Sequence, residues 1–235
     1  MDSETEAIEY AKKHKIEISR RLTDPNRYPP SVMPVTVLMA GSPGAGKTEF
    51  SKNLIEIVAE DPEHPPVRID GDELRSEIPN YTGKNSSQVQ GAVSILLGEL
   101  YERTLKNKQT VIVDGTLAAY DKAKENIDRS LKRGRRVIIF YVYQRPEVAW
   151  QFTLAREKIE GRNIPKDVFV DRFLKARATV TQLRTEYGRE VIIYLVKKNF
   201  LTNNVESVER IPADGPGLDA YLTDTYTEES LLALL

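Results

Sequence analysis

The chain has 235 residues, of which 40% are apolar and 29% charged, so it can bury the core of one α/β domain with additions. Its 34 Lys and Arg balance 35 Asp and Glu, which leaves a formal charge of -1 and no overall positive field to attract nucleic acid. The lack of cysteine excludes disulfides and thiolate metal sites and favours a reducing compartment. The N-terminus is acidic where a secretory signal would be basic, and no run approaches the roughly 18 apolar residues of a membrane span. We therefore expect a cytoplasmic protein with no nucleic-acid or membrane partner.

Periodicity predicts a helix from Ser3 to about Leu22, ending in the turn-rich segment DPNRYPPS. Five apolar, β-branched runs then alternate with helical patterns: VTVLMA (35–40), VRID (67–70), TVIVDG (110–115), RVIIFYVY (136–143) and VIIYLV (191–196). Strands that alternate with helices indicate a parallel sheet, and continuously apolar strands indicate a sheet covered on both faces. The prediction is an α/β fold with a five-stranded, mainly parallel sheet and helices on both faces.

Two further helices are expected between the fourth and fifth strands, one beginning at Pro146 and one near Pro165. The residues that we expect them to bury are Val148, Phe152, Ala155 and Ile159 in the first, and Phe169, Phe173, Ala176, Val180, Leu183 and Tyr187 in the second. We expect three regions. They are an N-terminal helix and linker (1–32), a core (33–198) with a lid loop near 156–165, and a C-terminal extension (199–235) whose role the sequence does not indicate.

A glycine-rich segment follows the first apolar run and precedes an amphipathic helix. It consists of Gly41, Ser42, Pro43, Gly44, Ala45, Gly46, Lys47 and Thr48, and it fits the phosphate-loop pattern GxxxxGK[ST]. Its backbone N–H groups would surround phosphate oxygens at the helix N-terminus, Lys47 would reach the β- and γ-phosphates, and the Thr48 hydroxyl would bind Mg²⁺. The alternative is an ordinary glycine turn. We predict that the segment binds a nucleoside triphosphate, ATP.

Acidic residues end the next two strands. In RIDGDELR, Asp70 suits a carboxylate associated with Mg²⁺ and Asp72 suits a base for an incoming hydroxyl, although Asp72 could instead cap the following helix. In VDGT, Asp114 and Thr116 reach the same edge. Asp114 could serve as a metal-binding acid or as a substrate-binding carboxylate, or the segment could be a simple turn.

Basic residues gather in the loop between the two predicted helices. The segment REKIEGRN holds Arg156, Lys158 and Arg162, and the loop could fold down over the phosphates. The planar, permanently charged guanidinium suits the charge that spreads over a phosphoryl group during transfer. A solvated basic loop is the alternative.

Together, GSPGAGKT, IDGDELR with IPNYTG, VIVDGT and AREKIEGRNIPKDVF resemble the zeta toxin family of P-loop kinases over roughly residues 33 to 196. The resemblance implies a three-layer, nucleotide-kinase-like fold. It also implies transfer of phosphate from ATP to the 3'-hydroxyl of the sugar in UDP-N-acetylglucosamine, and a small helical antitoxin as partner. By motif match it assigns Lys47 and Thr48 to ATP and Mg²⁺, and Asp72 to the general base. It further assigns Asp114 and Thr116 to the sugar nucleotide, and Arg156 and Arg162 to the γ-phosphate.

The sequence departs from the family pattern after VDGT, where Leu117 and Ala118 stand in place of an arginine that we would expect there. This departure concerns the acceptor rather than phosphoryl transfer. A kinase of a different small molecule, such as a dinucleotide or an antibiotic, therefore stays an alternative. A kinase of nucleic-acid ends and a nucleotide-gated binding module are the other two.

Overall fold

The computed structural model describes residues 3–58, 64–161, 163–222 and 224–235. The helices are α1 (Ser3–Leu22), α2 (Lys47–Val58), α3 (Gly71–Arg75), α4 (Gln90–Lys106), α5 (Tyr120–Leu131), α6 (Pro146–Glu160), α7 (Lys166–Tyr187) and α8 (Glu228–Leu234), with short 3-10 turns at Gly188–Glu190 and Leu218–Ala220. The strands are β1 (Val35–Ala40), β2 (Val67–Asp70), β3 (Val111–Asp114), β4 (Arg136–Tyr143), β5 (Val191–Lys198) and β6 (Val205–Ile211). The predicted α/β alternation is confirmed.

The strands form one sheet in the order β2-β3-β1-β4-β5-β6. Strands β1 to β5 pair in parallel, as predicted, and β6 pairs antiparallel with β5. The prediction of five strands was wrong, because the described part of the sheet has six. The missed strand, VESVERI, mostly alternates exposed and half-buried residues and lies at a sheet edge, so it lacks the apolar run that marks the five parallel strands.

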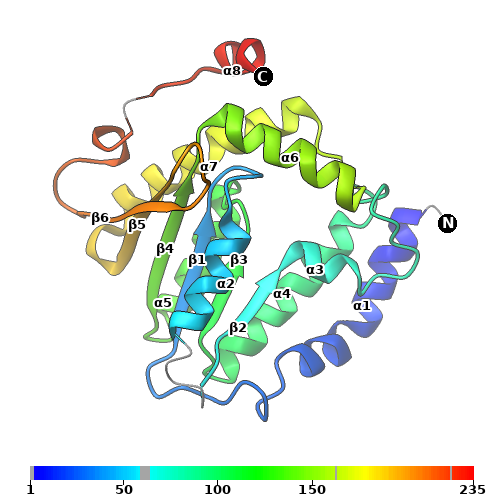
Figure 1. Ribbon diagram of the computed structural model, residues 1–235. Helices are drawn as coiled ribbons and strands as arrows, with labels where there is room; N and C mark the ends of the chain where they lie inside the picture. Colours follow the sequence, from blue (N-terminus) through cyan, green and yellow to red (C-terminus); the bar gives the residue numbers. More distant parts are fainter. Residues whose placement is uncertain (1–2, 59–63, 162, 223) are drawn as a thin grey trace.

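Helices cover both faces of the sheet, and Figure 1 shows α2 in front of it. On this face, Ala45 of the glycine-rich loop and Phe50 of α2 pack against β-strand residues such as Met39 and Val142. On the opposite face, α5, α6 and α7 pack against β1, β4 and β5, with Ile127 and Phe169 among the fully buried residues. The result is a three-layer arrangement in which the carboxyl ends of the five parallel strands meet at one edge.

The N-terminal helix belongs to the packed body of the molecule. Helix α1 lies against α4, which in turn covers β2 and β3 (Figure 1). Ala7, Ala11 and Ile18 are buried in the same cluster as Val67 of β2. The division into the three regions 1–32, 33–198 and 199–235 stays a prediction.

Helix α6 turns a different face inward from the one predicted. Phe152 is 38% exposed and Ile159 is 84% exposed, whereas Ala149 and Trp150 are buried. The prediction rested on the spacing of apolar residues, whereas the inner face is set by the position of α6 across the carboxyl edge of the sheet, over the glycine-rich loop (Figure 1). The predicted inner face of α7 is confirmed, since its six residues are all buried.

Among the described residues, no helix is long and apolar enough to cross a membrane.

We predict that the packing of α1 on α4 contributes to global stability. Ile18 is only 5% exposed, so Ile18→Ala should lower the free energy of unfolding by about 2–4 kcal/mol. Ile16→Ala is the matched control on the same helix, because Ile16 is 39% exposed, and it should cost less than about 1 kcal/mol. Urea unfolding measures both changes. Equal effects would contradict the packing of α1.

Candidate active site

The glycine-rich loop lies at the carboxyl edge of the sheet, between β1 and α2. The Gly41 N–H donates to Thr116 O at 3.1 Å, which ties the loop to the segment after β3. A Cβ on Gly41 would lie 2.3 Å from Val142 O, and one on Gly44 would lie 2.0 Å from Ala149 O. Both glycines also have positive φ, +135° and +71°. No other residue fits at either position, so the loop conformation requires both glycines.

Lys47 opens α2 and closes the loop. Its side chain is buried, and its Nζ donates to Ser42 O at 2.6 Å, across the mouth of the loop. Thr48 follows in the first turn of α2. The N–H groups of this helix end and its dipole favour an anion here. The loop therefore has the geometry of a phosphate site.

Asp70 caps the helix that follows β2. Its Oδ1 accepts from the Asp72 N–H at 2.8 Å, and α3 begins at Gly71. The alternative that Asp72 is the cap is wrong, because Asp72 lies inside the first turn. The side chain of Asp72 is therefore free of any capping role.

Arg68 joins the carboxylates at the ends of β2 and β3. Its Nη2 donates to Asp70 Oδ2 at 2.5 Å and to Asp114 Oδ2 at 2.6 Å. Ser51 of α2 completes this cluster, since its Oγ lies 3.0 Å from Asp114 Oδ2 and accepts from Arg68 Nε at 3.1 Å. The strand register explains the meeting, because Asp70 and Asp114 are direct partners across the parallel pair. Burial and the charge of Asp114 raise the pKa of Asp70, and Arg68 only partly offsets this.

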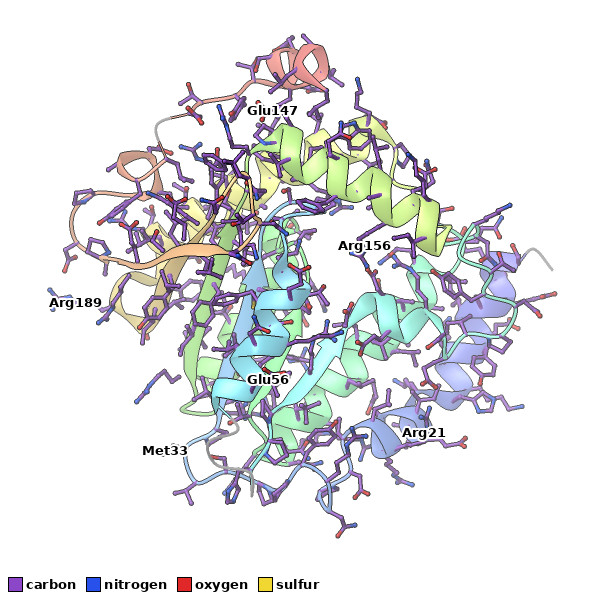
Figure 2. The ribbon with its side chains drawn as sticks, in the orientation of Figure 1. Arg21, Met33, Glu56, Glu147, Arg156 and Arg189 are labelled. Carbon is purple, nitrogen blue, oxygen red and sulfur yellow. The ribbon has the colours of Figure 1, made fainter. Side chains whose placement is uncertain are left out.

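Asp72 lies apart from this buried cluster. Arg75 donates through Nη1 to Asp72 Oδ1 and through Nη2 to Gln90 Oε1, the second at 3.0 Å. Arg156 Nη2 lies 3.8 Å from Asp72 Oδ2. Figure 2 shows Arg156 reaching from α6 toward α3. The Asp72 side chain is 35% exposed, whereas that of Asp114 is 4% exposed. Of the three aspartates predicted for the site, Asp72 is therefore the one that solvent and a substrate can reach.

Helix α6 bridges the phosphate loop and Asp72. Its backbone at Ala149 lies over Gly44, and its residue Arg156 lies beside Asp72. Seven residues of α-helix at 1.5 Å rise span about 10 Å. The loop and Asp72 therefore contact the same helix at points about 10 Å apart along its axis.

The sequence pattern also singled out Thr116, Arg162 and Lys158. Thr116 is half-buried and fixed to the loop through its carbonyl, next to Leu117, whose φ of 53° is unusual for a residue other than glycine. Arg162 lies outside the described residues. Lys158 is exposed, as the solvated-loop alternative expects.

The sequence analysis missed Arg68 and Arg75. A charged residue inside the apolar strand VRID was the available signal for Arg68. Arg75 stands three residues after Asp72 on a helix, a spacing that brings two side chains together.

A Mg²⁺ ion that bridges phosphates needs few protein ligands, because it keeps several waters. The described residues hold no group of three His, Asp or Glu that could form a separate metal site. Thr48 lies on the helix that carries Ser51, and Ser51 links this helix to Asp114. Asp70 and Asp114 are both paired with Arg68, so a Mg²⁺ ion at this site would be bound mainly by phosphate and Thr48.

Comparison with known proteins supports the same fold. The chain resembles, at 20% identity and a TM-score of 0.68, a protein of the PezAT chromosomal toxin-antitoxin system of the human pathogen Streptococcus pneumoniae, covering 100% of this chain and 94% of that one. An ATP-containing crystal structure of the AvrRxo1-ORF1:AvrRxo1-ORF2 complex matches at 14% identity and a TM-score of 0.55, covering 89% of this chain and 64% of that chain.

No curated protein matches the chain in sequence. The family model described as "Zeta toxin" matches residues 18–206, which is most of the chain and includes the phosphate loop, Asp72 and Arg156. The chain therefore belongs to the zeta toxin family.

Proposed function

We propose that the protein is a kinase that transfers the γ-phosphate of ATP to a hydroxyl group of a small molecule. The observation that carries the proposal is the reachable carboxylate of Asp72. It lies beside Arg156 of α6, the helix that also contacts the phosphate loop. A base that must meet an acceptor hydroxyl has to be accessible, and an arginine beside it suits the charge of a transferring phosphoryl group.

In this mechanism the loop binds the triphosphate through backbone N–H groups, and Lys47 turns from Ser42 O to the β- and γ-phosphates. Thr48 and Asp70 would hold a Mg²⁺ ion bound to the phosphates, which would supply positive charge against the charge that develops there. Asp72 orients the acceptor hydroxyl and takes its proton. Arg156, with Arg162 as a second candidate, stabilises the transferring phosphoryl group from the side of α6.

A hydrolase is less consistent with the site. An NTPase uses an acidic residue for Mg²⁺ and another group to orient water. Here Asp70 and Asp114 are buried and share the single charge of Arg68, whereas the Asp72 side chain is 35% exposed, so a larger acceptor can approach it. The separation of buried and reachable carboxylates therefore favours an alcohol acceptor over water.

For the acceptor we propose the 3'-hydroxyl of UDP-N-acetylglucosamine, bound in part by Asp114 and Thr116. Membership of the zeta toxin family supports this assignment and a role as the toxin of a pair. The similar chains from the PezAT system and from the AvrRxo1 complex, both found with a second protein, support a small antitoxin as partner. We place this activity in the cytoplasm, in keeping with a chain that contains no cysteine.

A second candidate is a kinase of another small molecule. The observation that favours it is Leu117, which packs against the hydrophobic core where the family pattern would place an arginine nearby. A missing cation at this position would remove a contact to an anionic substrate.

The test is an acceptor assay. The protein is incubated with γ-labelled ATP and a panel that contains UDP-N-acetylglucosamine, NAD and oligonucleotides. We expect label in the sugar nucleotide alone. Label in NAD would support the second candidate, and label in an oligonucleotide would contradict a small-molecule kinase.

A prediction concerns the base. Asp72→Asn keeps the shape of the side chain but cannot accept a proton, and the cap of α3 stays intact because Asp70 supplies it. Phosphate transfer should fall by about 10² to 10⁴, while ATP affinity changes little. Asp121→Asn, at an exposed acidic residue in the first turn of α5, is the control and should leave transfer unchanged. Normal transfer by Asp72→Asn would remove the base role.

Another prediction concerns Arg156 of α6. Because Arg156 acts on charge that spreads during transfer, Arg156→Ala should lower kcat by about a hundredfold or more and change the ATP dissociation constant less. Lys158→Ala is the control, two residues further along the same helix and exposed. Steady-state kinetics and calorimetry separate the two effects. An unchanged kcat would show that Arg156 is a solvated surface residue with no role in transfer.

A further inference from the structure

A second buried lysine reaches the phosphate loop from the opposite side of the site. Lys198 is the last residue of β5, and its side chain is only 4% exposed. Among the described residues, Lys47 and Lys198 are the lysines in the buried class. Lys47 has a place in the proposed function, and Lys198 has none so far.

The strand pattern aims Lys198 at the loop. Side chains of a strand alternate between its faces, and Tyr194 and Val196 pack on the face that α2 covers. Lys198 points to the same face, one step beyond Val196. The pairing with β6 shifts there, from Lys197 opposite Ser207 to Lys198 opposite Val205. This shift skips Glu206, so the extra residue lies on β6, and β5 keeps its alternation through Lys198.

The Lys198 ammonium touches the loop at Gly46. A Cβ on Gly46 would lie 3.1 Å from Lys198 Nζ and 3.0 Å from its Cε. The acidic neighbour of Lys198 is Glu49, whose Oε2 lies 3.7 Å away and whose side chain is 67% exposed. Burial lowers the pKa of Lys198, and the charge of Glu49 does not offset this. A buried ammonium beside a phosphate loop gains a close anionic partner when a nucleotide binds.

The sheet order indicates which phosphates Lys198 meets. The acceptor-side carboxylates follow β2 and β3, on one side of β1, whereas Lys198 ends β5, on the other side beyond β4. We propose that Lys198 binds the non-transferred phosphates of the nucleotide, from the side opposite the acceptor. This inference rests on the proposed function, because it needs a nucleotide in the loop.

The experiment is calorimetric titration of ADP and of ATP into the wild-type protein and two variants. Lys198→Met keeps an unbranched side chain that is one heavy atom shorter and removes its charge. It should weaken ADP and ATP by the same factor, about 10- to 100-fold, because both nucleotides carry the phosphates that Lys198 contacts. Lys197→Met is the matched control, since Lys197 is the preceding residue, is 30% exposed and pairs with Glu209. It should bind both nucleotides like the wild type.

A third variant separates binding from a structural role. If Lys198 only pairs with Glu49, Glu49→Gln should weaken nucleotide binding as much as Lys198→Met does. We expect Glu49→Gln to bind ADP at least as tightly as the wild type, because the lysine stays and a nearby negative charge is lost. This variant tests the proposal even where Lys198→Met does not fold, since a loss of nucleotide affinity in Glu49→Gln would by itself overturn it.

The remaining outcomes are distinct. Wild-type affinity in Lys198→Met would overturn the inference and leave the kinase proposal standing. A loss for ATP but not for ADP would place Lys198 at the γ-phosphate and overturn the assignment. No binding of either nucleotide to the wild-type protein would overturn the proposed function itself.

Discussion

The site depends on the close approach of the glycine-rich loop to backbone from two other elements. The positions that Cβ atoms would take at Gly41 and Gly44 coincide with the carbonyl oxygens of Val142 in β4 and Ala149 in α6. Because no side chain intervenes, the loop fixes the start of α6, and the direction of α6 then carries Arg156 to Asp72. A single packing constraint therefore sets both the phosphate site and the distance to the proposed base.

Charge is distributed unevenly within this frame. Arg68 draws Asp70 and Asp114 into a buried cluster with Ser51, while Asp72 stays reachable between Arg75 and Arg156. Burial makes each unpaired charge costly, so the cluster holds its carboxylates in fixed positions before any ligand arrives. The basic side chains around the loop belong to separate elements: Lys47 to α2, Arg156 to α6 and Lys198 to β5.

Local sequence predicted the parts of the fold and site that depend on short-range order. The five parallel strands were predicted because each is a short run dominated by β-branched and other apolar residues, and the loop was predicted because its pattern is contiguous. Strand β6 was missed because a solvent-exposed edge strand carries no such run. The inner face of α6 was assigned wrongly because the helix packs over the loop rather than along the sheet. Arg68 meets Asp114 and Lys198 meets Gly46, each far away in the chain, and only the strand order brings these residues together.

The most direct test of the account follows the γ-phosphate itself. Phosphorus NMR of the protein with Mg²⁺, ATP and UDP-N-acetylglucosamine resolves ADP, inorganic phosphate and a new phosphate ester in one sample. Our account predicts that ADP and the ester form in equal amounts, with little inorganic phosphate. Formation of ADP with inorganic phosphate alone, with this acceptor and with every other small molecule tried, would contradict a kinase and indicate a hydrolase.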